Sequence, residues 1–164
     1  MYQLIYDALT VDASKERTAT FGKVDWYSIK NGQLKEYQKQ ILAHALNYYD
    51  LSDMVGFEEW GHVAGIRKFP ESHQDKDEHL AAETGEVRTP LCSCIYYHKV
   101  ENLEGADLYL LEEDDENKIL DIVKPQTNML VLLDPGVWHG ISTYVSGTRS
   151  TININPWDYH VQQK

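Results

Sequence analysis

A succession of short segments rich in β-branched and aromatic residues runs through the chain from about Gly61 onward. Each is about as long as a β-strand, and turn signals such as Glu104-Gly105, Pro135-Gly136 and Ser146-Gly147 separate several of them. The segments are "HVAGIRKF", "PLCSCIYYHKV", "ADLYLLE", "ILDIVK", "NMLVLLD", "GISTYV" and "TRSTININ". Strands in such a series must bury one face against a second layer. The pattern therefore predicts a mainly β fold, a sandwich or a double-stranded β-helix (jelly roll).

One amphipathic helix is predicted ahead of these strands, within "GQLKEYQKQILAHALNYYDL". Its apolar residues recur at steps of three and four, with lysines and glutamines opposite. They are Leu34, Tyr37, Ile41, Leu42, Ala45, Leu46 and Tyr49. We expect this N-terminal helix to pack on one sheet, with His44 in a structural role at the edge of the stripe. At 164 residues the chain is most simply a single domain, 1–164.

The charge balance narrows the range of partners. With 26 acidic and 15 basic residues the net charge is −11, which repels phosphate backbones, so we expect no nucleic-acid partner. No stretch approaches the roughly 20 apolar residues of a membrane span, and "MYQLIYDALTVDASKER" lacks the pattern of a signal peptide. We therefore expect no membrane association and a cytoplasmic location. The two cysteines, Cys92 and Cys94, are expected to be core thiols.

Two separate stretches carry the residues of a candidate metal site. "ESHQDKDEH" contains His73 and Asp75, which an extended conformation projects to the same side. His139 follows a Pro-Gly turn in "DPGVWHGI". Two histidines and one carboxylate form the facial triad of non-haem Fe(II) oxygenases, which leaves metal positions open for a co-substrate and O₂. A shifted pair, Asp77 and His79, is an alternative within the first stretch.

A polar stripe on the last predicted strand accompanies the triad. Arg149 in "SGTRSTININPW" lies ten residues after His139, and Thr151, Asn153 and Asn155 share its face of the strand. Buried polar groups are costly unless they line a wet pocket. A guanidinium there can bind a carboxylate through two parallel hydrogen bonds, and it stays charged when buried.

The stretch from about Ile66 to Trp157 resembles the catalytic core of the Fe(II)/2-oxoglutarate-dependent dioxygenases, closest to the prolyl-hydroxylase branch. The H-x-D pair, the distal histidine and the arginine ten residues later carry this resemblance, together with "CIYYHKVENLEGADLYLLE" and "IVKPQTNMLVLLDPGVWHGI". The resemblance implies that the iron ligands are His73, Asp75 and His139. It also implies that Arg149 holds the distal carboxylate of 2-oxoglutarate, helped by the hydroxyls of Tyr97 and Thr151. Tyr96 competes with Tyr97 for that role.

By the same resemblance, the activity is hydroxylation of a peptidyl, prolyl-type residue or of a free amino acid. The implied cofactor is Fe(II), the co-substrates are 2-oxoglutarate and O₂, and succinate and CO₂ are released. The catalytic core is expected over about 62–158. The carboxylate of Asp75 favours hydroxylation, because related halogenases lack it and bind chloride at the iron instead.

The sequence also allows alternatives to the dioxygenase interpretation. A jelly-roll module that binds or senses a metal without turnover is a different class of protein, and Arg149 distinguishes the two because such a module has no need of it. The segment 76–88 has little strand character and is either a mobile lid or a solvated connection. Ordinary packing or surface roles are expected for the remaining histidines and the flanking tryptophans, which are His62, His98, His160, Trp138 and Trp157.

Overall fold

The computed structural model describes residues 1–17, 22–65, 72–115 and 117–163. Nine strands dominate these residues and are accompanied by short helices. The elements are β1 (Tyr2–Ile5), α1 (Ala13–Glu16), β2 (Asp25–Ser28), the 3-10 helix η1 (Ile29–Asn31), α2 (Glu36–Leu46), β3 (Gly56–Val63), α3 (Glu78–Thr84), β4 (Ser93–Gly105), β5 (Leu108–Leu111), β6 (Ile119–Val123), β7 (Met129–Leu133), β8 (Trp138–Ile141) and β9 (Tyr144–Trp157).

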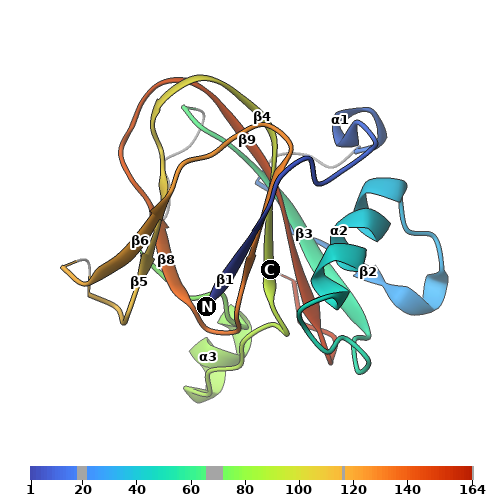
Figure 1. Cartoon of the computed structure of the whole chain (residues 1–164). Coiled ribbons are helices and arrows are strands. Elements are labelled where there is room, and N and C mark those ends of the chain that lie inside the picture. The colour runs from blue at the N-terminus through green and yellow to red at the C-terminus, as the bar shows by residue number, and fades with distance from the viewer. Residues whose placement is uncertain (18–21, 66–71, 116, 164) are drawn as a thin grey trace.

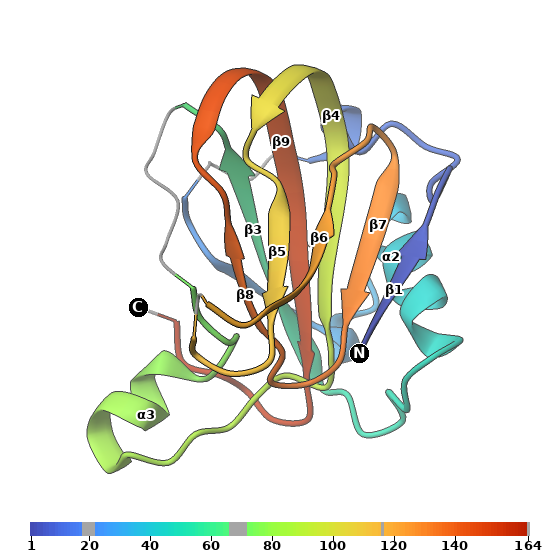
Figure 2. The same cartoon turned by 60° about the vertical axis from the view of Figure 1, so that its left-hand side comes forward.

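Two antiparallel sheets form the body of the molecule (Figure 1). The large sheet has the strand order β1-β7-β4-β9-β3-β2, and the small sheet has the order β6-β5-β8. In the turned view the small sheet lies in front of the large one, so the two sheets face each other (Figure 2). The prediction of a mainly β fold with packed antiparallel sheets is confirmed at this level.

Each face of the large sheet packs against a different layer, and strand alternation decides which side chains go where. On β4 and β9, Cys94, Tyr96, Ile152 and Ile154 point outward into a core shared with α2. Tyr97, the next residue on β4, points inward, into a second core between the sheets. The inner core also contains Ile95, Leu108, Leu110, Val123, Met129, Val131 and Leu133.

The predicted amphipathic helix is present as α2 and covers the outer face of the large sheet (Figure 1). Its buried residues are Tyr37, Gln38, Ile41, Leu42 and Ala45. Two positions differ from the predicted stripe: Gln38, expected on the polar face, is buried and donates to Glu59, and Leu46, expected to be buried, is 60% exposed. Its first turn is fixed by side chains, because the Lys35 N–H donates to Gln38 Oε1 at 2.9 Å and the Glu36 N–H to Glu16 Oε2 at 2.9 Å. His44 Nε2 lies 2.6 Å from the Ala8 carbonyl oxygen, which agrees with a structural role.

The N-terminal part and two strand boundaries differ from expectation. β1, β2, α1 and most of β3 were not predicted, whereas "GISTYV" is divided between the end of β8 and the start of β9. Of "HVAGIRKF", the first two residues end β3, and residues 66–69 lie outside the described residues. Both cysteines are buried and unbridged, as predicted.

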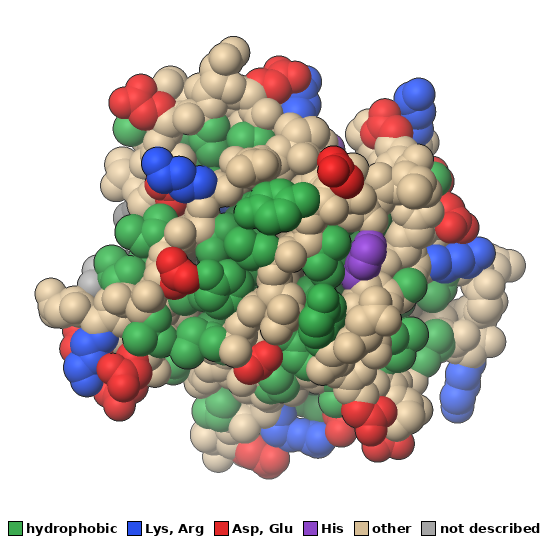
Figure 3. Space-filling model, in the orientation of Figure 1, with side chains coloured by type: hydrophobic (Ala, Val, Ile, Leu, Met, Phe, Trp, Pro, Cys, Tyr) green, Lys and Arg blue, Asp and Glu red, His purple; other side chains and the backbone are tan. Residues whose placement is uncertain are grey.

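Apolar side chains are exposed around β6 and the N-terminal strand, on the face seen in Figure 3. β1 and β6 are edge strands of their sheets. The exposed residues there are Met1, Tyr6, Ile119, Leu120 and Ile122. None of the helices among the described residues is long and apolar enough to cross a membrane.

Candidate metal centre

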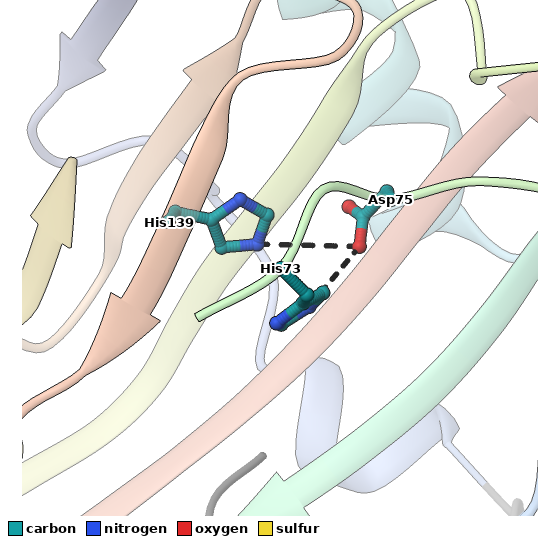
Figure 4. Close-up of side chains that lie close together, drawn as sticks. All are labelled: His73, Asp75 and His139. Atoms are coloured by element: carbon teal, nitrogen blue, oxygen red, sulfur yellow. Dashed lines mark ion pairs between the residues drawn. The ribbon is translucent and has the colours of Figure 1, made fainter. Parts of the chain in front are cut away.

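Three side chains from two segments meet beside β8 (Figure 4). His139 lies on β8, and His73 and Asp75 lie on the segment that precedes α3. The His73 N–H donates to the His139 carbonyl at 2.9 Å, and the His139 N–H donates to the His73 carbonyl at 2.8 Å. This antiparallel bridge fixes the two histidine backbones side by side.

The donor atoms of the triad lie close enough together for one metal ion. Asp75 Oδ1 lies 3.5 Å from His73 Nε2 and 4.0 Å from His139 Nε2. The centroids of the two imidazole rings are 4.6 Å apart. Because a bond from a metal such as zinc to imidazole or carboxylate is about 2.1 Å long, two ligands of one ion can lie up to about 4.2 Å apart. The triad can therefore hold a divalent ion with small side-chain adjustments.

Two further contacts orient the ligands. The Ser93 hydroxyl donates to Asp75 Oδ2 at 2.6 Å, which leaves Oδ1 to face the histidines. His139 Nδ1 lies 2.9 Å from the Val137 carbonyl oxygen. A proton on Nδ1 satisfies that carbonyl and leaves the Nε2 lone pair directed at the metal position. Such outer hydrogen bonds fix the tautomer and ring orientation in metal sites generally.

The electrostatics of the site favour metal-binding protonation states. Burial raises the pKa of the Asp75 carboxyl, but the hydrogen bond from His73, the nearness of His139 and the Ser93 hydroxyl outweigh it and hold that pKa well below its usual range. Burial lowers the pKa of His139 more than the Asp75 carboxylate raises it. At neutral pH the site therefore presents an ionised carboxylate and a neutral His139, the forms that bind metals.

Arg149 lines the same small cavity as the triad, between the two sheets. The cavity has a volume of about 80 Å³ and is lined by Trp60, His62, His73, Asp75, Ile95, His139, Ile141, Arg149, Asn153 and Asn155. Arg149 is only 2% exposed, and its Nη2 donates to the Tyr97 hydroxyl oxygen at 3.4 Å. Its Cζ lies 5.0 Å from the centroid of the Tyr97 ring. The cavity therefore has metal-ligating groups and a buried guanidinium in its lining.

The two tyrosines that competed for a role beside Arg149 point to opposite faces of β4. Tyr97 is fully buried, and burial raises the pKa of its phenol despite the nearby guanidinium, so it stays a neutral hydroxyl. Tyr96 belongs to the outer core and donates its hydroxyl to Asn128 Oδ1 at 2.8 Å. Of the two, only Tyr97 contacts the arginine.

The polar stripe on β9 faces inward as predicted. Asn153 and Asn155 line the cavity with Arg149. Thr151 is buried between Arg149 and Asn153, and its Oγ1 accepts from Asn153 Nδ2 at 3.4 Å, but it is not among the lining residues. Thr151 therefore shares the inward face of β9 with Arg149 but does not line this cavity.

Asp77 and His79 have other partners. Asp77 Oδ1 caps α3 by accepting from the Leu80 N–H at 2.9 Å, and its Oδ2 accepts from the Tyr159 hydroxyl at 2.7 Å. His79 Nε2 lies 3.2 Å from Glu83 Oε1 on the same helix. The segment 76–88, expected to be either a lid or a solvated connection, contains this capped helix, which ends at Gly85.

His98, His160 and Trp157 have the packing roles that were expected of them, whereas His62 does not. His98 Nε2 lies 2.6 Å from Ser150 Oγ, and the His160 ring stacks on Trp26 with centroids 4.6 Å apart. Trp157 is packed in the interior, as expected. His62, by contrast, lines the cavity.

Sequence reasoning missed Trp60, His62 and Ser93 as residues of the site. Alternation on β4 carries a signal for Ser93, because that residue shares the inward face with Tyr97. The chain was compared with models of protein families and with curated proteins, and nothing matched in either comparison.

Proposed function

We propose that this protein is an Fe(II)- and 2-oxoglutarate-dependent dioxygenase that hydroxylates a peptidyl, prolyl-type residue or a free amino acid. The donor set supports the choice of metal. Two imidazole nitrogens and one carboxylate oxygen from His73, His139 and Asp75 converge within 4.8 Å, and this combination is typical of non-haem Fe(II) oxygenases.

The observation that carries the proposal is the buried guanidinium of Arg149 in the wall of the cavity that also contains the triad. Burying a cation is costly, and a site that only binds a metal gains nothing from a second positive charge nearby. A dicarboxylate co-substrate fits this arrangement, because one of its ends would face the metal position and the other would face the guanidinium of Arg149. The hydroxyl of Tyr97 is placed beside the guanidinium to donate to the same carboxylate.

The residues of the chain have separate tasks in this proposal. His73, Asp75 and His139 hold the metal, with Ser93 and Val137 fixing the orientation of two of these ligands. Arg149 and Tyr97 hold the distal carboxylate of 2-oxoglutarate, while Ile95 and Ile141 limit the access of water. When bound, Fe(II) would activate O₂, and oxidative decarboxylation of 2-oxoglutarate would supply two electrons, so that one oxygen atom of O₂ enters a C–H bond of the substrate and the other enters succinate, with release of CO₂.

The strand order supports a more specific assignment of the fold, a double-stranded β-helix. From β3 onward the chain passes repeatedly between the two sheets: β3, β4, β7 and β9 belong to the large sheet. β5, β6 and β8 belong to the small sheet, and the bridge at His73 adds a further pairing at the free edge of β8. Antiparallel strands that pass between two facing sheets in this way are the pattern of a jelly roll.

An anaerobic titration tests the proposal. The purified protein is loaded with Fe(II) and titrated with 2-oxoglutarate while the visible spectrum is followed for a weak metal-to-ligand charge-transfer band. We expect a saturable band, and we expect its loss in His139→Ala, which removes one ligand. Arg149→Ala should weaken 2-oxoglutarate binding by more than tenfold and leave Fe(II) binding nearly unchanged, because a charge-assisted contact to the distal carboxylate is lost.

Arg88→Ala is the matched control, since it removes an arginine whose side chain is 42% exposed, pairs with Asp158 and neither lines the cavity nor belongs to the triad. If Fe(II) binds and no band forms, the protein is a metal-binding module and not an oxygenase. If Arg149→Ala weakened Fe(II) binding and 2-oxoglutarate binding equally, this result would contradict the proposal that Arg149 binds the distal carboxylate of 2-oxoglutarate.

A further inference from the structure

A second cavity adjoins the metal centre and does not include Arg149. Its volume is about 200 Å³, and it shares Trp60, His73, Asp75 and Asn155 with the first cavity. The remaining lining residues are Val24, Glu58, Gln74, Lys76 and Glu78. If the cavity with Arg149 holds the co-substrate, the primary substrate must approach the metal from another direction. The second cavity provides that approach.

Glu58 is a carboxylate in the wall of this cavity. It lies on β3, two residues from Trp60 and on the same face of the strand. Its oxygens accept from Trp157 Nε1 at 2.9 Å and from Gln163 Nε2 at 3.1 Å, both uncharged donors. A carboxylate has about four acceptor positions, so two are left for a ligand. Among the described residues, no cation lies within ion-pair distance of Glu58.

Asn155 supplies an independent indication of a ligand. It lies opposite Glu58 in the register of β3 and β9, and it lines both cavities. The side chain is 97% buried, since only 3% remains exposed. Its Oδ1 has no hydrogen-bond donor within the part of the chain that the structure describes. A buried carbonyl oxygen without a donor is costly, and a donor on a bound ligand removes that cost.

Three carboxylates line this cavity, those of Glu58, Asp75 and Glu78. Glu58 and Asn155 form its inner wall, Glu78 lies exposed at its rim, and Trp60 contributes an aromatic ring. An aromatic face attracts cations, most strongly when the ring is an indole. Among the residues that the structure describes, Lys76 is the one lysine or arginine in the lining.

We propose that this second cavity binds an ammonium or guanidinium group of the primary substrate, held by Glu58 and Asn155 beside Trp60. The substrate is then a basic amino acid or a peptide with a lysyl or arginyl side chain at or next to the residue that reacts. This assignment rests on the proposed function for the choice of the cavity as the substrate side. The binding of the cation itself does not depend on turnover.

The test compares two probes that differ only at the cationic group, Nα-acetyl-L-lysine amide and Nα-acetyl-L-norleucine amide. Each is titrated into the full chain, metal-free and loaded with Zn(II), while backbone amide shifts on β3 and β9 are followed by NMR. We expect the lysine probe to bind at least tenfold more tightly, because a charge-assisted hydrogen bond is made only with the ammonium group. Glu58→Gln should abolish this preference, since the amide keeps the shape of the side chain and loses its charge.

Glu104→Gln is the matched control, because it removes the same charge from an exposed position on β4 outside both cavities. Asn155→Leu keeps the branched shape of the side chain, removes the acceptor and should weaken binding of the lysine probe severalfold. The spectrum of each variant reports whether it is folded. Equal affinity of the two probes, no measurable binding of the lysine probe, or a preference that survives in Glu58→Gln would overturn the inference.

The two proposals fail in distinguishable ways. If the charge-transfer band forms but the lysine probe is not preferred, the proposed oxygenase function stands and the proposed cation site is wrong. If the lysine probe is preferred but no charge-transfer band forms, the cation site stands and the proposed oxygenase function is wrong.

Discussion

At the scale of single residues, the buried polar groups on the two faces of the large sheet differ in how they are satisfied. Glu59 on the outer face is fully buried, and it accepts from the Tyr37 hydroxyl at 2.8 Å and from Gln38 Nε2 at 3.0 Å. Arg17 Nε lies 3.4 Å from its Oε2 and supplies the opposite charge. Such a compensated group is structural. Glu58, its neighbour in sequence, faces inward, and its donors within the described part of the chain are the neutral groups of Trp157 and Gln163.

Ser93 is the residue whose contribution to the metal centre can be isolated most cleanly. Ser93→Ala removes the hydroxyl that donates to Asp75 Oδ2 and leaves all three ligands in place. The freed carboxylate can rotate, so we expect the affinity for Mn(II), measured by electron paramagnetic resonance, to fall about 10- to 100-fold. Ser52→Ala, a change at an exposed position, is the control. An unchanged Mn(II) affinity in Ser93→Ala would show that Asp75 is oriented by its backbone alone.

At the scale of elements, local sequence predicted strands that are built on a run of apolar residues, such as β5 and β7. β7 is apolar throughout and is buried at every position. β1 and β2 are four residues long and form the edges of the large sheet, so they are defined by pairing with β7 and β3 and not by a pattern of their own. Pairing between distant segments cannot be read from a short stretch of sequence.

The site shows the same division between local and distant information. The spacing of His73 and Asp75 and the position of Arg149 on the inward face of β9 follow from strand alternation, which the sequence contains. The hydrogen bond from Ser93 to Asp75 joins two segments that are separate in sequence, and the one from Gln163 to Glu58 depends on where the C-terminal residues lie. Neither contact follows from a local sequence pattern. α3 is an exception, because its start and stop signals, Asp77 and Gly85, are local and were not used.

Asp77→Ala tests whether α3 depends on its cap and whether Asp77 binds the metal. The substitution removes the acceptor for the Leu80 N–H and for the Tyr159 hydroxyl. We expect the free energy of unfolding in urea to fall by about 1–2 kcal/mol, the usual cost of an N-cap. The Mn(II) stoichiometry should stay at one, because Asp75 is untouched. If Asp77→Ala loses the metal and Asp75→Ala retains it, the ligands are the shifted pair.

At the scale of the whole molecule, the acidic excess acts on stability as well as on partners. A net charge of −11 on a chain of 164 residues creates repulsion in the folded state, where the charges are closest together. The ion pairs between side chains that face solvent offset little of this repulsion, because their partners are well exposed, as with Lys99 and Glu101 (53% and 61%) or Lys118 and Glu113 (48% and 72%). Screening by salt should therefore stabilise the fold.

We expect the melting temperature of the metal-free protein to rise by about 2–4 °C between about 10 mM and about 0.15 M NaCl at pH 7.5. This corresponds to roughly 1 kcal/mol for a protein of this size, and over this range the Debye length falls from about 30 Å to about 8 Å. Differential scanning calorimetry measures the shift. A variant with Asp53→Asn, Glu86→Gln and Glu104→Gln, all at exposed positions, carries three fewer negative charges and should show a smaller rise. A melting temperature that falls with salt in both proteins would mean that attractive ion pairs outweigh the repulsion, and that the acidic excess has no net cost to the fold.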